Sequence, residues 1–302
     1  MWDVVGVGAN SIDQVYRLPA HPRPDSPGGK LQIREHFVSP GGQTATALCT
    51  CAAMGLRTNY VGVFGHDQAT HILRNELTRR GVGLDDSITR EAPNAYAVIL
   101  IDESQGERVV LWDRDPRLSF LADEIQPKAI RNARLLHVDD VDMDAALQAA
   151  SLARHAGVPI TSDIERVTNR TQEMLAEVTV PILAEHVPSQ LTGKSDFEES
   201  LRMLRRPHHQ MLCVTLGRRG ALLLDGDRIH RVPGVAVDVV DTTGAGDVFR
   251  GAFICALLRG DSPGEILRFA NAAAAVSCTR PGAISSVPDA EEAQQMLRRP
   301  DA

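Results

Sequence analysis

The segment DTTGAGDVFRGAF, residues 241–253, places three small residues directly before a carboxylate. Apolar residues recur at helical spacing after Asp247, which predicts a helix that begins at about Ala245. The first backbone N–H groups of a helix lack intrahelical partners, and the helix dipole is positive at this end. Because Gly244, Ala245 and Gly246 carry almost no side chain, an anion can approach those N–H groups closely. The segment therefore predicts an anion site.

Asp247 lies in the first turn of the predicted helix. An aspartate with an ordinary pKa of ~3.9 is ionised at neutral pH and can accept a proton from an alcohol. A base beside an anion site suits phosphoryl transfer to a hydroxyl group. The alternative is that Asp247 only caps its helix and that the glycines only form a turn.

The second half of the chain alternates short apolar runs with helical patterns, which is typical of a parallel sheet covered by helices on both faces. The predicted strands are RLLHV (134–138), VPITSDI (158–164), MLCVTLG (211–217), GALLLDG (220–226) and VAVDVVD (235–241). The predicted helices are DAALQAASLARHAG, closed by Gly157, then DVFRGAFICALLRG (247–260) and PGEILRFANAAAAVSC (263–278). We expect one domain over residues 1–302.

Two stretches of the first half do not follow this rhythm. KLQIREHF (30–37) alternates apolar and polar residues, and YAVILIDESQGERVVLW (96–112) reads as two strands about a turn at Gln105 and Gly106. Strands of this kind are typical of an antiparallel sheet with one wet face. We expect a small β lid, residues 12–39 and 94–115, on a core of residues 1–11, 40–93 and 116–302.

Composition excludes several classes of function. The net charge of −7 argues against nucleic acid as a partner, because there is no excess of cations to displace its counterions. The five cysteines are scattered without metal-ligand or disulfide spacing, which favours a reducing, cytoplasmic location. We expect no basic leader and no membrane span.

DTTGAGDVFRGAF, residues 241–253, resembles the carboxy-terminal signature of the ribokinase-like, or PfkB, carbohydrate kinase family. SPGGQTATALCTCAAMGLRTNYVGVFGHDQAT, residues 39–70, resembles its first signature, so the resemblance covers essentially the whole chain. It implies a three-layer αβα sandwich with a mostly parallel central sheet and a β lid. It also implies an enzyme that transfers the γ-phosphoryl group of ATP to a hydroxyl of a small carbohydrate.

The resemblance assigns catalytic and sugar-binding roles to particular residues. Asp247 matches the general base, and the amides of Gly244, Ala245 and Gly246 match the anion hole. Asp13 matches the carboxylate that holds sugar hydroxyls, and Gly41 and Gly42 match a glycine pair that contacts the sugar. Further candidates for sugar binding are Asn10, Gln43 and Thr46. Thr46 departs from the family pattern, because many relatives carry Asn at this position.

The resemblance also implies nucleotide and cation sites. The nucleotide candidates are Thr215, Gly217, Gly220, Asn271, and the anion-hole residues Gly244 and Gly246. For a monovalent cation such as K⁺, the matching positions are Asp241, Thr243, Ser277, Arg280, Gly282 and Ser286. Mg²⁺ is expected with ATP. Relatives hold it through an NxxE motif that this chain lacks, and Glu185 is the nearby carboxylate that could substitute.

The acceptor is left open between a ketose, a pentose, a nucleoside and a sugar phosphate. Arg108 lies near a predicted lid strand, and an anion bound there would favour a phosphorylated sugar. Many family members dimerise through the lid, so a homodimer is expected.

Two other classes compete with the kinase. GVGANS near the amino terminus suggests a dinucleotide-dependent oxidoreductase, but Ser11 stands where the third glycine of GxGxxG belongs. A sugar-binding regulator without activity would explain Thr46 and the missing NxxE motif, but not the intact GAGD.

Overall fold

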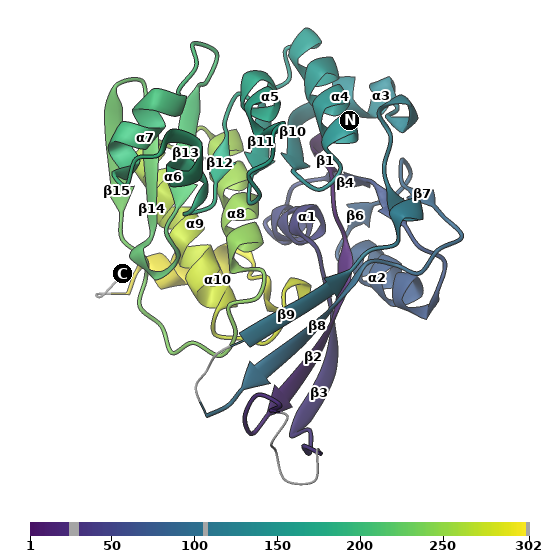
Figure 1. Cartoon of the computed structure of the whole chain (residues 1–302). Coiled ribbons are helices and arrows are strands. Elements are labelled where there is room, and N and C mark those ends of the chain that lie inside the picture. The colour runs from purple at the N-terminus through teal and green to yellow at the C-terminus, as the bar shows by residue number, and fades with distance from the viewer. Residues whose placement is uncertain (24–29, 105–107, 300–302) are drawn as a thin grey trace.

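The computed structural model describes residues 1–23, 30–104 and 108–299 (Figure 1). The predicted turn at Gln105 and Gly106 lies outside these ranges. The chain forms a helix-covered central sheet, and a second, smaller sheet projects from one end of it (Figure 1).

The central sheet has two parts, which meet where the parallel bridges Thr161–Val180 and Ile164–Leu183 join them. Every pairing up to β13 is parallel, and β14 and β15 then add two antiparallel pairings at one edge. The strands in spatial order are β6 (Val82–Gly83), β4 (Thr58–Val61), β1 (Trp2–Val7), β10 (Ala133–Asp139), β11 (Ile160–Asp163), β12 (Ile182–Leu183), β13 (Met211–Thr215), β14 (Ala221–Asp225) and β15 (Arg228–Val232). This confirms the predicted α/β fold with a mostly parallel sheet.

Helices cover both faces of the central sheet, and each face has its own apolar core. The helices on one face are α3 (Pro127–Arg131), α4 (Met143–His155), α5 (Thr171–Glu177), α6 (Val187–Thr192) and α7 (Phe197–Leu204). Those on the other are α1 (Gln43–Ala53), α2 (Gln68–Arg79), α8 (Ala245–Arg259), α9 (Pro263–Ser277) and α10 (Ala290–Leu297). Short strands β5 (Val63–Phe64) and β7 (Ile88–Thr89) pair separately. The three helices predicted from the sequence, now α4, α8 and α9, are confirmed.

The smaller sheet, called the lid sheet below, has the order β3 (Glu35–Gly41), β2 (Ser11–Leu18), β8 (Tyr96–Asp102) and β9 (Arg108–Asp113). Its central pair, β2 and β8, is parallel, so the expectation of an antiparallel sheet is wrong for that pair. The reason is topological. Two excursions of the chain each leave the core on one strand and return on the next, and the two outgoing strands are neighbours.

Two predicted strands also differ from the structure. Strand β3 begins at Glu35 rather than at Lys30, because its partner β2 ends at Leu18 and pairs Arg17 with Glu35. The segment VAVDVVD is irregular, because β15 pairs with β14 directly after the turn at Gly226. Pro233 and Gly234 then follow the end of β15, and the chain leaves the sheet before residue 235.

Candidate active site

Gly244 begins the site by forming the N-cap of α8 with φ +75°. A Cβ atom placed on it would lie 2.7 Å from Ala283 Cβ, so both its conformation and its surroundings require glycine. A Cβ on Gly246 would lie 2.7 Å from a guanidinium nitrogen of Arg250. Glycine at these two positions lets Ala283 and the Arg250 guanidinium lie against the backbone of the first turn of α8.

Asp247 lies half-buried in this first turn. Loss of hydration raises the pKa of its carboxyl well above the ordinary value, and the positive charge of Arg250 opposes that shift. The negative charges of Glu165, Asp139 and Asp13 raise the pKa further. Carboxylates on β2, on β10 and in the segment after β11 thus interact electrostatically with Asp247. A carboxylate in this setting is a stronger base than an exposed one.

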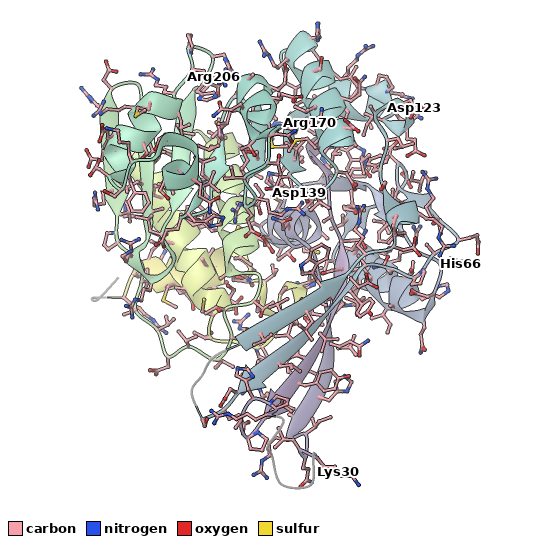
Figure 2. All side chains as sticks on the ribbon, in the orientation of Figure 1. Lys30, His66, Asp123, Asp139, Arg170 and Arg206 are labelled. Atoms are coloured by element: carbon pink, nitrogen blue, oxygen red, sulfur yellow. The ribbon has the colours of Figure 1, made fainter. Side chains whose placement is uncertain are left out.

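Asp139, at the end of β10, is a member of the site that the sequence did not predict. Its Oδ2 accepts hydrogen bonds from the Ala9 amide at 2.6 Å and from Thr44 Oγ1 at 2.7 Å, and its Oδ1 accepts one from the Val141 amide at 3.1 Å. Figure 2 shows Asp139 beside α1. Burial raises the pKa of Asp139 to about 6 against the effect of these donors. The residue ties together the ends of β1 and β10 and the start of α1.

Asp13, Gly41 and Gly42 meet where β2, β3 and α1 converge. Asp13 is buried, and its Oδ1 accepts a hydrogen bond from Ser11 Oγ at 3.2 Å. A Cβ on Gly41 would lie 2.9 Å from Asp13 Oδ2. Gly42 caps α1 with φ +100°, and a Cβ there would lie 2.4 Å from Asn10 Cα. The glycine pair therefore exposes backbone beside the Asp13 carboxylate.

Asn10 is held by the protein itself. Its amide donates to Tyr60 Oη at 2.7 Å and to the Val63 carbonyl at 2.8 Å, and its Oδ1 accepts from Asn94 at 3.0 Å. The side chain thus fixes the loops beside Asp13. Its predicted contact with sugar stays a prediction, as do the contacts of the other site residues.

Thr46 and Gln43 lie on α1, next to the start of α8. Thr46 is fully buried, and its Cγ2 lies 3.5 Å from the position that a Cβ on Gly244 would take. Within the described residues, Thr46 Oγ1 and Gln43 Nε2 have no hydrogen-bond partner. The helix that carries the first family-like signature therefore contacts the second signature directly.

The nucleotide candidates lie in the part of the sheet that contains β13. Thr215 ends β13, and Gly217 and Gly220 have φ of +54° and +87° in the turn that follows. Asn271 on α9 donates to the carbonyls of Val232 at 3.2 Å and Pro233 at 3.0 Å. Its amide therefore anchors α9 to the end of β15 in this structure.

The candidate cation residues lie at the end of α9 and on two loops, 241–243 and 280–286, that Asp241 joins. Its Oδ1 accepts from the amide and hydroxyl of Thr243 at 2.9 and 2.7 Å, and its Oδ2 accepts from the Gly282 amide at 2.8 Å. The remaining candidates are also engaged locally: Ser277 and Ser286 donate to backbone carbonyls, and Arg280 pairs with Glu292. Because these side chains are engaged locally, a cation here would depend chiefly on backbone carbonyls.

Comparisons with known proteins identify the family of this chain. The family model described as pfkB family carbohydrate kinase matches residues 3–290. The chain belongs to the PfkB family of carbohydrate kinases. It is 30% identical to a protein named fructokinase from Solanum tuberosum, over 98% of this chain and 95% of that one.

Solved structures of ribokinases match the fold over nearly the whole chain. Ribokinase from Arabidopsis thaliana, in complex with ribose and ATP, superimposes with a TM-score of 0.84 at 26% identity, covering 99% of both chains. Ribokinase from Thermotoga maritima superimposes with a TM-score of 0.83 at 25% identity, over 99% of this chain and 100% of that one. This PfkB member is an ATP-dependent sugar kinase, a phosphotransferase with an alcohol group as acceptor.

The carboxylate suggested for magnesium is engaged elsewhere. Glu185 pairs with Arg219 at 2.7 Å, and both side chains are exposed. In the part of the chain that the structure describes, no group of three His, Cys, Asp or Glu side chains could hold a metal ion. None of the described helices has the length and apolarity that a bilayer crossing requires.

Proposed function

We propose that this kinase phosphorylates a neutral sugar of the ketose class, with fructose as the first candidate. Asp247 removes the proton from the acceptor hydroxyl, and the amides at Gly244–Gly246 stabilise the charge on the transferring γ-phosphoryl group. Asp13 and the backbone at Gly41 and Gly42 hold the sugar. The observation that carries this proposal is the half-buried Asp247 carboxylate in the glycine-containing first turn of α8.

The charges of the site favour a neutral acceptor. The negative charges of Asp13, Asp139 and Glu165 act on Asp247, and the opposing positive charge of Arg250 is already paired with Asp163. The remaining negative charge would repel a sugar phosphate. Arg114, which could otherwise attract an anion, donates to Asp142 at 3.0 and 2.6 Å.

The arginine that the sequence analysis named is not placed. The side chain of Arg108 lies outside the described residues. The name of the Solanum tuberosum relative supports the choice of a ketose.

The lid sheet supplies an aromatic side chain on the face that carries Asp13. Ser39, Asp13, Ala97 and Trp112 form one row across the sheet, so all four side chains lie on the same face. Trp112 is 72% exposed, and the small side chain of Ala97 separates it from Asp13. We propose that Trp112 contacts the apolar face of the bound sugar, and that lid closure excludes water.

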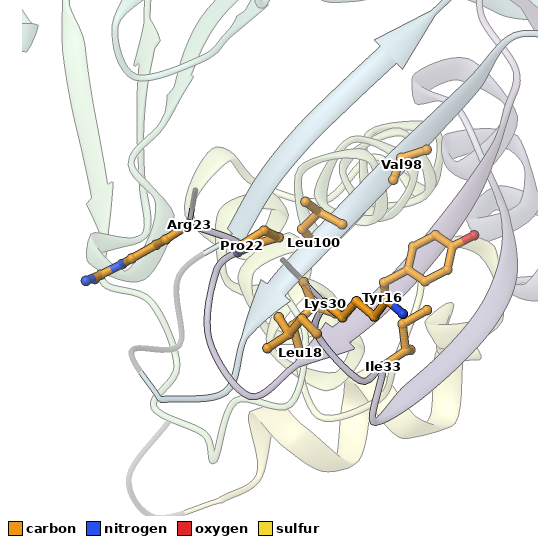
Figure 3. Close-up of a pocket in the computed structure, with 9 residues that line it drawn as sticks. Tyr16, Leu18, Pro22, Arg23, Lys30, Ile33, Val98 and Leu100 are labelled. Carbon is orange, nitrogen blue, oxygen red and sulfur yellow. The ribbon is translucent and has the colours of Figure 1, made fainter. Parts of the chain in front are cut away.

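The opposite face of the lid sheet is apolar, and we propose that it forms a homodimer interface. Val38, Val109 and Leu111 are exposed on this face. A pocket of about 460 Å³ lies there, and Tyr16 and Val98 are among the residues that line it (Figure 3). Pairing two such faces would cover these side chains, and sedimentation at micromolar concentration tests the assembly.

Cofactors, compartment and domain division complete the proposal. Mg²⁺ would arrive with the phosphates of ATP, because Glu185 is already paired with Arg219. K⁺ would bind carbonyls of the loops joined by Asp241. A cytoplasmic location is consistent with the reduced, mostly buried cysteines. We also propose that residues 1–302 form one domain, in which residues 12–39 and 94–115 form the lid.

An acceptor panel tests the proposed function. The purified chain is incubated with ATP, Mg²⁺ and K⁺ and with fructose, ribose, fructose 6-phosphate or adenosine, and ADP release is measured. The phosphorylated carbon is then assigned by phosphorus NMR. Fructose should give the highest kcat/KM, whereas a preference for the sugar phosphate or the nucleoside would contradict a neutral ketose.

A further inference from the structure

Arg250 and Asp163 form an ion pair in the interior, beneath the candidate active site. Arg250 lies on α8 and is 1% exposed, Asp163 ends β11 and is 0% exposed, and their closest atoms are 2.5 Å apart. Neither carboxylate oxygen of Asp163 has a partner in hydrogen-bond geometry within the described residues, so the contact is chiefly ionic. Burying two charges is costly, and replacing such a pair by apolar residues is often neutral for stability. Stability alone is therefore a weak reason for this pair.

The position of the pair relates it to the reaction. Arg250 follows Asp247 by three residues on the same helix, which places the two side chains on one face. A guanidinium nitrogen of Arg250 lies 2.7 Å from the position of a Cβ on Gly246. The guanidinium thus lies against the first turn of α8, where the phosphoryl group would be held.

The charges facing this region are mostly negative. They come from Asp13 on β2, Asp139 on β10, Asp163 on β11 and Glu165 beyond it. Two neutral side chains also lie near Arg250: His137, whose pKa burial lowers to about 3, and Cys213, whose pKa burial raises. The guanidinium carries a positive charge that interacts with both Asp163 and Asp247.

We propose that Arg250, which is paired with Asp163, is a positioning residue for catalysis: its guanidinium keeps Asp247 ionised so that the carboxylate can accept the proton of the sugar hydroxyl. The proposal rests on the proposed role of Asp247. Removing the charge should raise the pKa of Asp247, because a positive neighbour favours the ionised form. Removing Asp163 should not, because it takes away a negative charge.

Three variants separate this role from a purely structural one: Arg250→Gln, Arg250→Lys and Asp163→Asn. Their pH dependence of kcat/KM is measured with ATP and the best sugar of the panel, beside their melting temperatures. In Arg250→Gln the acidic limb should move upward by about one pH unit or more. Arg250→Lys keeps the charge, so the acidic limb of its pH profile should lie nearer that of wild type. In Asp163→Asn the acidic limb should stay where it is in wild type or move to lower pH.

A second readout does not depend on turnover. The chain is labelled with ¹³C at its aspartate carboxyl groups, Asp247→Asn identifies the Asp247 resonance, and its titration is followed in wild type and variants. An unchanged Asp247 titration in Arg250→Gln, or an upward shift in Asp163→Asn, would overturn the proposal. If Arg250→Gln does not fold, Asp163→Asn decides, because an upward shift of the Asp247 titration in that variant would overturn the proposal. Failure of the proposed function would instead appear as absent turnover in the wild type with any sugar.

Discussion

A comparison of Gly244→Ala with Gly260→Ala should separate the backbone strain at Gly244 from its role beside the anion. Gly244 and Gly260 flank α8 with φ of +75° and +83°, so Gly244→Ala and Gly260→Ala impose similar backbone strain. That strain costs about 1–2 kcal/mol for a residue with a Cβ. A Cβ on Gly260 meets no atom within 4 Å, whereas one on Gly244 would lie 2.7 and 2.9 Å from Ala283 Cβ and Cα.

The contacts at Ala283 set the expected difference between the two variants. They are well below the ~3.5–4.0 Å of an optimal carbon–carbon contact, and overpacking of this kind costs typically about 1–3 kcal/mol. Gly244→Ala should therefore lose about 2–5 kcal/mol of the free energy of unfolding, and Gly260→Ala about 1–2 kcal/mol.

Turnover should separate them further. The new methyl group displaces the loop at Ala283 and moves the Gly244–Gly246 amides, and loss of one such donor typically costs about 10²–10³-fold in kcat. Gly260→Ala should keep turnover near that of wild type. Urea unfolding gives the stabilities and ADP release gives kcat. Near-normal turnover in Gly244→Ala, or equal losses of stability in both variants, would refute this account of the α8 cap.

Three further predictions concern the lid, a buried histidine and the cation. Trp112→Ala should raise the KM for sugar with little change in the KM for ATP. The chain has one other tryptophan, Trp2, so a change in tryptophan fluorescence on sugar binding that is lost in Trp112→Ala can be assigned to Trp112. An unaltered KM for sugar would remove Trp112 from the site. Burial lowers the folded-state pKa of His137 to about 3, so folding keeps this side chain neutral. The free energy of unfolding should therefore be highest above pH ~6.5, the ordinary pKa of histidine, and should fall by up to ~1.4 kcal/mol per pH unit below it. In urea unfolding, His137→Gln should lose this pH dependence, and an unchanged dependence would contradict the role of His137. Replacing K⁺ by tetramethylammonium should lower kcat, and equal rates in both salts would rule out the proposed cation site.

Local patterns predicted much of the fold. The apolar stripe after Asp247 and the glycines at both ends of α8 are signals within one helix, and the structure confirms that helix. The wrong predictions depended on distant pairing. VAVDVVD has the composition of a strand, but β14 pairs with the segment that precedes it. The parallel pairing of β2 with β8 joins segments more than 80 residues apart, and hydrophobic alternation carries no information on strand direction.

The candidate site shows the same division. Gly244, Asp247, Gly41 and Gly42 belong to short motifs and were found from the sequence. Asp139 was not found, because two of its donors, Ala9 after β1 and Thr44 on α1, lie far away in the chain.

The buried Asp163–Arg250 pair could not be predicted from the sequence either. Asp163 and Arg250 stand 87 residues apart, and only the packing of α8 near the end of β11 brings them into contact. An aspartate beside a strand end and an arginine within an apolar helix give no local sign of that contact.

The most direct test of the central claim is the turnover of Asp247→Asn, measured with saturating ATP and the best sugar of the panel. Asn keeps the size of the side chain and removes its ability to take a proton, so kcat should fall by about 10²–10⁴-fold while the Kd for nucleotide stays close to that of wild type. A kcat near the wild-type value in a folded Asp247→Asn protein would contradict the role of Asp247 as the base.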